Sequence, residues 1–418
     1  MTAPASAAGQ QDTETTLALL YKAIARMPDN VDAMFGLAGT YMRIGQLEEA
    51  ADWCARASAV ERSPRLDHLR SAIEDAFIKR ALYEVIDGRM AAAVQTLARP
   101  ADVPGATARR YRELFLTASA WFEDAARLSP ETDAIRLSVP VWGRDYVSAA
   151  SSGLLASLLA PGNLPALARR KGVRLEITTT VTGQAMLEAE PVLAALRRHA
   201  AVDYFAIPDS IVSAPPPPDF SYWVMSAAHY ASMERARHAR SAISFLTADT
   251  LLSDGSLEAA QKLLDGGMKA VLASALEVDH AAVAPSDRRR GEPLSLAGSD
   301  LVHHGLTRLG LSPADTIPNG CKILTPSSFA VNGGYVAYSF HFLPLMLAAE
   351  LTTREFMRDL LTVDTRTVRI ALGDTAPAGC VKIITEPSEI AIASSLSGSR
   401  GAQKPGVPSS DALGRWAA

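Results

Sequence analysis

A carboxylate follows an apolar run in the middle of the chain, within Ser241–Ala273. The run leads into Asp249, Asp254 lies five residues further on, and an amphipathic segment and a second apolar run, Ala270–Ala273, complete the stretch. This order predicts strand, acidic loop, helix and strand. Ligands of parallel α/β sheets bind at the carboxyl ends of the strands, so we expect Asp249 where a charged ligand or a metal ion would bind. The alternative is that Asp249 only closes a turn and that Asp254 only caps the helix.

Polar residues also follow the other predicted strands of this region. Period-two or apolar patterns predict the strands Ile135–Val141, Val173–Thr179, Ala201–Pro208 and Ala242–Thr247. Helical stretches separate them, which indicates βαβ units and a mostly parallel sheet. Right-handed crossovers place the carboxyl ends of such strands at one edge. Trp142, Thr178 and Asp249 are therefore expected to face the same crevice.

Upstream of this region, residues 13–130 have the composition of helices, rich in Ala, Leu, Arg and Glu. Within Asn30–Ser63, small or apolar residues recur at Met34, Leu37, Ala38, Tyr41, Gly45, Ala50, Cys54 and Ala57. This pattern resembles the 34-residue tetratricopeptide repeat, with looser copies before and after it. The resemblance implies a short helical solenoid that holds a protein or peptide partner. The alternative is that these helices only buttress the second domain.

Residues 134–389 resemble a glycosyltransferase of the GT-A kind in their order of elements. The resemblance lies in a strand ending in Trp-Gly, a long helix, a strand with Thr, and the stretch FLTAD followed by a small polar loop and SLEAA. That family holds a divalent metal ion against the diphosphate of a nucleotide sugar with an Asp-x-Asp motif. Here Thr247 replaces the first acid, so only Asp249 matches the motif.

The resemblance implies a role for each candidate residue. Implied ligands of Mn²⁺ or Mg²⁺ are Asp249, Asp254 and His341, and implied contacts of the nucleotide sugar are Trp142, Gly143, Arg144, Thr178 and Asp249. Glu277 or Asp279 would take a proton from the acceptor. Without a metal ion, Arg144, Lys322 or a helix N-terminus would have to neutralise the diphosphate. The alternatives are a solvated loop acid for Glu277 and Asp279 and a core histidine for His341.

Composition limits the class of protein. With 418 residues, 48% hydrophobic and 21% charged residues, the chain is expected to form two or three domains of a globular protein. A net charge of −4 argues against nucleic-acid binding. No apolar run is long enough to span a membrane, no secretory signal is recognised, and Cys54, Cys321 and Cys380 are spaced far apart, which together favour the cytoplasm. Motifs of dehydrogenases, P-loop enzymes, α/β-hydrolases and zincins are absent.

The sequence therefore predicts an α/β protein in four segments. Residues 1–12 are expected to be a disordered lead, 13–130 a tetratricopeptide-like solenoid, 134–392 a Rossmann-like, GT-A-like αβα domain, and 393–418 a disordered tail. The predicted function is transfer of a sugar from a nucleotide-sugar donor to an acceptor, which the solenoid recruits. Two alternatives stay open: a non-catalytic adaptor with a degenerate transferase-like domain, and another sugar- or nucleotide-modifying enzyme.

Overall fold

The computed structural model describes residues 7–98, 105–131, 134–212, 220–284, 289–308, 321–324, 327–332, 335–339, 342–351, 368, 372–373, 379–384 and 386–396. Contacts divide the chain into two compact units, Met1–Ser119 and Ala120–Ala418, which we call the helical unit and the α/β unit. None of the described helices is long and apolar enough to cross a membrane.

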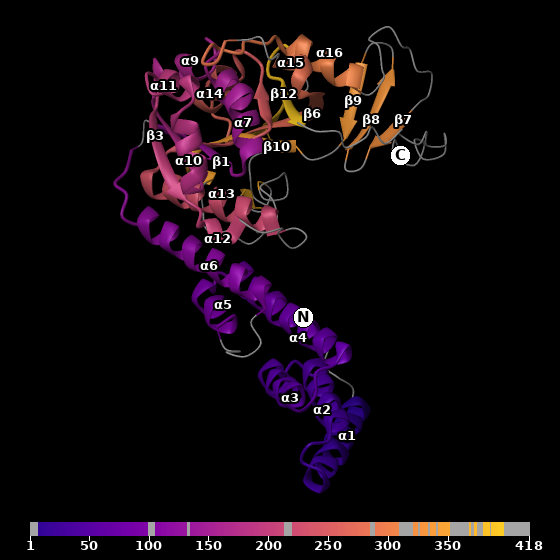
Figure 1. The fold of residues 1–418 in the computed structure, drawn as a ribbon. Helices are drawn as coiled ribbons and strands as arrows, with labels where there is room; N and C mark the ends of the chain where they lie inside the picture. The colour runs from indigo at the N-terminus through magenta and orange to yellow at the C-terminus, as the bar shows by residue number, and fades with distance from the viewer. Residues whose placement is uncertain are drawn as a thin grey trace. The chain divides into compact units, whose positions relative to one another are not determined.

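The helical unit is built from helices, most of which pack against a neighbour in sequence (Figure 1). They are α1 (Ala7–Arg26), α2 (Val31–Arg43), α3 (Leu47–Val60), α4 (Pro64–Ile86), α5 (Met90–Thr96) and α6 (Ala106–Ala125), of which the last ends in the α/β unit. The Asn30 side chain caps α2 by accepting from Ala33 N at 2.9 Å. Gly45 adopts φ +79° in the turn between α2 and α3, a conformation that glycine takes without strain. The predicted helix pair in Asn30–Ser63 is thus confirmed as α2 and α3.

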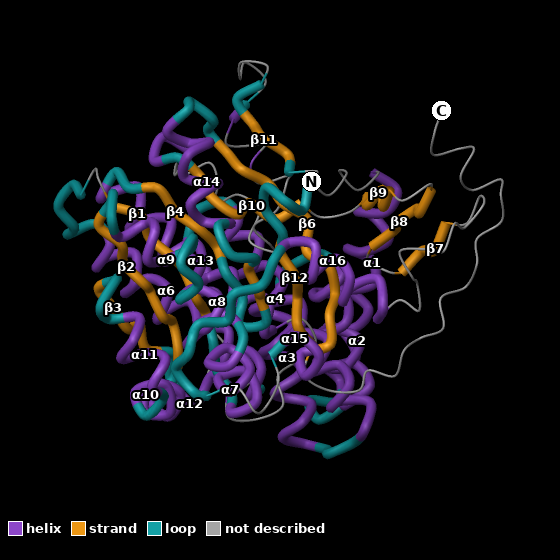
Figure 2. The backbone as a smooth tube through the Cα atoms, turned by 90° about the horizontal axis from the view of Figure 1, so that it is seen from above, coloured by secondary structure: helices purple, strands orange, loops and turns teal. Residues whose placement is uncertain are grey.

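The α/β unit contains a nine-stranded, mostly parallel sheet and a separate three-stranded one. The large sheet consists of β1 (Ala134–Pro140), β2 (Gly172–Thr179), β3 (Ala201–Ala206), β4 (Ala242–Phe245), β5 (Thr250–Leu252), β6 (Ala270–Asp279), β10 (Phe342–Leu347), β11 (Val381–Ile383) and β12 (Ile392–Leu396). Its order is β3-β2-β1-β4-β10-β6-β12-β5, with β11 also paired to β6 (Figure 2). Strands β7 (Cys321–Leu324), β8 (Ser327–Asn332) and β9 (Tyr335–Ser339) form the small antiparallel sheet.

Helices cover both faces of the large sheet. They are α7 (Arg144–Ser152), α8 (Leu154–Leu158), α9 (Leu164–Ala168), α10 (Val181–Glu188), α11 (Pro191–Leu196), α12 (Asp209–Val212), α13 (Phe220–Ala239), α14 (Ser256–Asp265), α15 (His280–Val283) and α16 (Gly298–Arg308), with a 3-10 turn at Ala349–Leu351. Leu137 and Leu175 face a core shared with α7, α8, α9, α11 and α14. The alternate strand residues Arg136 and Glu176 face α13, on the opposite side of the sheet.

The alternation in β1 and the existence of β2 match the prediction, but later elements differ from it. Strand β6 continues to Asp279, whereas the sequence ended it near Ala273. Its second half, rich in helix-forming Ala, Leu and Glu, is held as a strand by its pairing with β12. Strand β12 itself includes residues 393–396, which were expected to belong to the disordered tail. At the other end, α1 begins at Ala7, within the expected disordered lead.

Candidate functional site

The order of the first four strands defines where a ligand would enter the α/β unit. The chain runs from β1 outward to β2 and β3, and then returns to the other side of β1 as β4. All four strands are parallel. In such a sheet the crevice lies outside the carboxyl ends of the strands, where the winding changes direction. Here that place lies between the residues that follow β1 and those that follow β4.

The residues after β4 form a rigid turn that carries Asp249. Leu246 N donates to Ser138 O at 2.9 Å, which extends the pairing of β4 with β1. Thr250 N then donates to Thr247 O at 3.0 Å, while the Thr250 hydroxyl accepts from Thr247 N at 3.1 Å. The two threonine hydroxyls also lie 2.8 Å apart. These bonds close the turn on both sides and fix the main chain that carries the half-buried Asp249.

Ser394 in strand β12 contacts the Asp249 carboxylate. Its hydroxyl donates to Asp249 Oδ2 at 2.6 Å. A hydrogen bond of this length to an ionised acceptor is of the strong, charge-assisted kind. Nothing in the local sequence connects two residues 145 positions apart, so the sequence analysis missed Ser394.

The residues after β1 lead directly into the N-terminus of α7. Gly143 adopts φ +82° and ends the loop, and α7 begins at Arg144 without a side-chain cap. A side chain at position 143 would meet no atom within 4 Å, so the backbone angle alone makes glycine favourable there. The Arg144 side chain is exposed and Trp142 is half-buried. An uncapped helix N-terminus presents N–H groups and a partial positive charge, which favour an anion.

Asp254 has both carboxylate oxygens engaged in loop contacts. Oδ1 accepts from Gly162 N at 2.7 Å, and Oδ2 accepts from the Ser295 hydroxyl at 2.6 Å. Asp254 thereby ties together the loop before α9, the loop before α14 and the segment before α16. Throughout the described part of the chain, no three Asp, Glu, His or Cys residues gather in a way that could hold a metal ion.

The acids proposed as proton acceptors lie at the end of β6. Asp279 is exposed and caps α15 by accepting from Ala281 N at 3.0 Å. The backbone of Glu277 is in register with Ser394 of β12, and its side chain lies outside the described residues. His341 also lies outside them, as does the side chain of Lys322.

His280, which follows Asp279, makes a contact that the sequence did not indicate. Its Nε2 lies 2.9 Å from the hydroxyl of Ser152 at the end of α7. The Ser152 hydroxyl also lies 2.9 Å from Ser148 O, and the tautomer of the imidazole decides which partner donates in the contact with His280. The pair joins α7 to α15.

Thr178 lies one residue before the end of β2 and is buried, with 1% of its surface exposed. By the alternation of the strand it faces the same side as Glu176, toward α13. Among the described residues, its hydroxyl has no hydrogen-bond partner.

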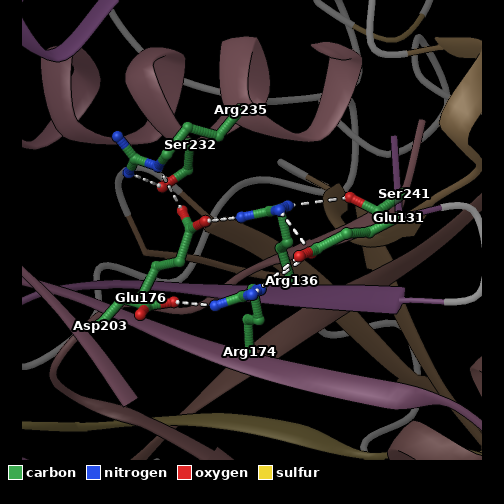
Figure 3. A network of polar contacts seen from close by, with 8 residues as sticks. All are labelled: Glu131, Arg136, Arg174, Glu176, Asp203, Ser232, Arg235 and Ser241. Atoms are coloured by element: carbon green, nitrogen blue, oxygen red, sulfur yellow. Dashed lines mark hydrogen bonds and ion pairs between the residues drawn. The ribbon is translucent and has the colours of Figure 1, made fainter. Parts of the chain in front are cut away.

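On that face, a network of charges lies between the sheet and α13, and its inner members Arg136, Glu176 and Arg235 are buried (Figure 3). Its charged members are Glu131, Arg136, Arg174, Glu176, Asp203 and Arg235. Glu176 is fully buried and accepts from Arg136 at 2.6 Å and from Arg235 at 2.9 Å. Three positive and three negative groups balance, so we interpret this network as structural.

The network also fixes the segment that precedes β1. Glu131 accepts two bonds from Arg174, at 2.7 and 2.8 Å, and one from Arg136 at 2.9 Å. The hydrogen bonds from Arg174 lower the pKa of the Glu131 carboxyl. Charged residues at alternate positions of two predicted strands, Arg136 in one and Arg174 and Glu176 in the other, could have indicated a charged face of the sheet. The sequence did not show which of these groups would pair.

Comparisons with known proteins agree with the helical prediction. Residues 7–73 match a family model described as tetratricopeptide repeat. No curated protein matches the sequence. Seven chains of solved structures match, and one of them is a mutant O-GlcNAc transferase of Thermobaculum terrenum, with 12% identity and a TM-score of 0.15. That match covers 56% of this chain and 47% of the transferase chain, so the chain spans about half the length of that relative. At its N-terminus, over residues 7–73, the chain is thus similar to the tetratricopeptide repeat.

Proposed function

We propose that the α/β unit is a Rossmann-like, GT-A-like glycosyltransferase that moves a sugar from a nucleotide-sugar donor to an acceptor. The observation that carries the proposal is the position of Asp249. Its closed turn follows β4, and the uncapped N-terminus of α7 follows β1, the parallel neighbour of β4. The two features flank the place where parallel sheets of this winding bind nucleotides.

In this proposal, different groups contact the two ends of the donor. The N–H groups at the start of α7 and the guanidinium of Arg144 attract the diphosphate and stabilise the charge that develops on the leaving nucleotide. Trp142, which is half-buried, lines the nucleotide, whereas we place the buried Thr178 outside the contact with the donor. A carboxylate repels a diphosphate unless a cation lies between them, so without a metal ion Asp249 contacts the donor by accepting hydrogen bonds from its hydroxyl groups.

A divalent metal ion at Asp249 stays a prediction. Mn²⁺ and Mg²⁺ prefer several oxygen ligands, and among the described residues no three Asp, Glu, His or Cys side chains gather at Asp249. Asp254 already accepts two hydrogen bonds. We therefore assign no step of the transfer to a metal ion, and the experiment below compares binding with and without one.

We further propose that the helical unit recruits the acceptor, a protein or peptide. Tetratricopeptide repeats support protein interactions, and residues 7–73 match that family. Glu277 or Asp279 would then accept the proton from the acceptor hydroxyl. The exposure of Asp279 is compatible with this role, although one of its oxygens caps α15.

A non-enzymatic adaptor is the second candidate. The observation that favours it is that both carboxylate oxygens of Asp254 accept hydrogen bonds from loop residues. Of the two expected acids, Asp249 and Asp254, this leaves Asp249 to contact a donor. In that case the helical unit would bind its partner while the α/β unit would bind no donor.

Titration calorimetry with UDP-, GDP- and dTDP-sugars, with and without Mn²⁺, separates the two candidates. We expect one donor to bind, and Asp249→Asn to weaken it by about tenfold or more because a hydrogen bond to a charged group is lost. Asp265→Asn, at the far end of α14, is the control and should leave the affinity unchanged. Binding of no donor would favour the adaptor. A donor that binds equally to the Asp249→Asn protein would refute the site.

A further inference from the structure

Strand β12 brings a late segment of the chain to the candidate site. It lies between β6, to which it is parallel, and β5, to which it is antiparallel. In this register Ser394 is opposite Thr250 of β5 on one side and Glu277 of β6 on the other. Ser394 is therefore the point of β12 that lies beside the Asp249 turn, and its hydroxyl donates to Asp249 Oδ2 at 2.6 Å.

Other bonds attach β12 to the sheet without the Ser394 hydroxyl. Besides the strand pairing, Ser253 N donates to Ala391 O at 2.9 Å, and Ala391 N donates to the Ser253 hydroxyl at 3.1 Å. Ile392 and Ala393, which flank Ser394 on the N-terminal side, are buried in the core. The Ser394 hydroxyl is thus not required to hold the strand, and its contact is directed at the carboxylate.

The contact with Ser394 acts on the side chain of Asp249, whereas the bonds between Thr247 and Thr250 act on the main chain and hydroxyls of the turn. Hydrogen bonds between Thr247 and Thr250 fix the main chain of the turn, but a carboxylate can still rotate about its side-chain torsions. A charge-assisted bond to one oxygen favours the orientation of the carboxylate in which that bond is made. Partners that orient a functional group in this way commonly affect activity strongly without touching the ligand.

We propose that Ser394 is a positioning residue, which holds the Asp249 carboxylate in the orientation that contacts the nucleotide-sugar donor. This inference rests on the proposed function. It assigns part of the site to a strand more than a hundred residues downstream of β6.

The test uses the full chain with Ser394→Ala, the conservative Ser394→Thr, and Ser253→Ala as a control that loosens β12 away from Asp249. Two readouts are needed, donor affinity by calorimetry and hydrogen exchange of residues 246–252 without ligand. We expect Ser394→Ala to weaken donor binding by about tenfold and to speed exchange in the turn, because a charge-assisted bond is lost. Ser394→Thr should restore the affinity to within about twofold, since its hydroxyl can donate in the same way.

Three outcomes would overturn the inference. Unchanged affinity and exchange in Ser394→Ala would show that the bond orients nothing. An equal loss of affinity in Ser253→Ala would show that attachment of the strand, and not the hydroxyl, matters. A loss of affinity in Ser394→Thr equal to that in Ser394→Ala would exclude the hydroxyl as the cause. Failure of the unaltered chain to bind any donor would refute the proposed function instead, and the exchange comparison would still decide whether Ser394 orders the turn.

Discussion

His229 on α13 links the stability of the α/β unit to pH. His229 is 4% exposed, and the centroid of its imidazole lies 5.3 Å from that of the Phe245 ring, in an edge-on arrangement. The imidazole is hydrogen-bonded to the backbone of Leu246, and burial lowers its pKa from 6.5 to about 4. The unfolded chain binds a proton at this histidine below pH 6.5, whereas the folded chain does so only near pH 4. Stability is therefore lost as the pH falls from about 6.5 to about 4, by about 2 kcal/mol at pH 5.

Urea unfolding at pH 7 and pH 5 measures this effect. We expect the unaltered protein to lose about 2 kcal/mol more between these two pH values than His229→Gln, which has no group that titrates there. The comparison of the two proteins removes the contribution of carboxylates, which titrate in both. An equal loss in both proteins would mean that the imidazole is not held neutral by its surroundings.

Among single residues, the sequence identified candidates that follow a predicted strand. It did not identify residues that come into contact only in the folded chain. Asp249 was a candidate for ligand binding because it closely follows the apolar run of β4. Ser394 was missed because its bond to Asp249 joins segments 145 residues apart, and such pairs leave no local pattern. For Asp254, the same sequence was compatible with a cap and with a ligand, and its two hydrogen bonds are formed by loops from elsewhere in the unit.

The attachment of α13 to the sheet depends on Glu176, which lies between two arginines. Glu176→Gln would leave Arg136 and Arg235, both 3% exposed in their side chains, with one fewer negative partner in a buried layer. Breaking a buried pair in this way costs about 3–5 kcal/mol. We expect that loss in the free energy of unfolding measured by guanidinium denaturation of the α/β unit.

Glu188→Gln provides the matched control for this prediction. Glu188 on α10 also pairs with an arginine, Arg197, but the two side chains are 35% and 45% exposed. Solvent-exposed pairs contribute about 0–1 kcal/mol, so this variant should unfold almost as the unaltered protein does. Similar losses for the two variants would show that the buried layer admits water.

Elements were predicted well where one pattern decides them. Strand β1 alternates between the core and α13, and the sequence shows this as a period of two. The second half of β6 and the strand β12 lack such a pattern. Ala, Leu, Glu and Ser dominate there, and pairing with each other, not propensity, makes these segments extended.

The division into two units predicts how the whole chain unfolds. The helical unit and the α/β unit have separate sets of internal contacts. We expect calorimetry to show two transitions, because domains with their own cores unfold as separate cooperative units. Phe77 in α4 is 1% exposed, so Phe77→Ala leaves a cavity in the core of the helical unit. We expect it to lower the free energy of unfolding of that unit by about 3–5 kcal/mol and to shift only the transition of that unit.

Glu176→Gln should in the same experiment lower only the other transition. A single transition that both variants shift together would contradict the division. Composition and periodicity predicted a helical N-terminal region and a mostly parallel sheet in the rest of the chain, since helix-forming residues dominate the first part and strand patterns the second.

The place of β12 in the large sheet has a consequence for synthesis of the protein. Strands β5 and β6 leave the ribosome more than a hundred residues before β12, which lies between them. Until then each has an unpaired edge, and such edges readily pair with other chains. The nascent α/β unit is therefore open to aggregation during this interval, and it is the period in which a chaperone would protect it.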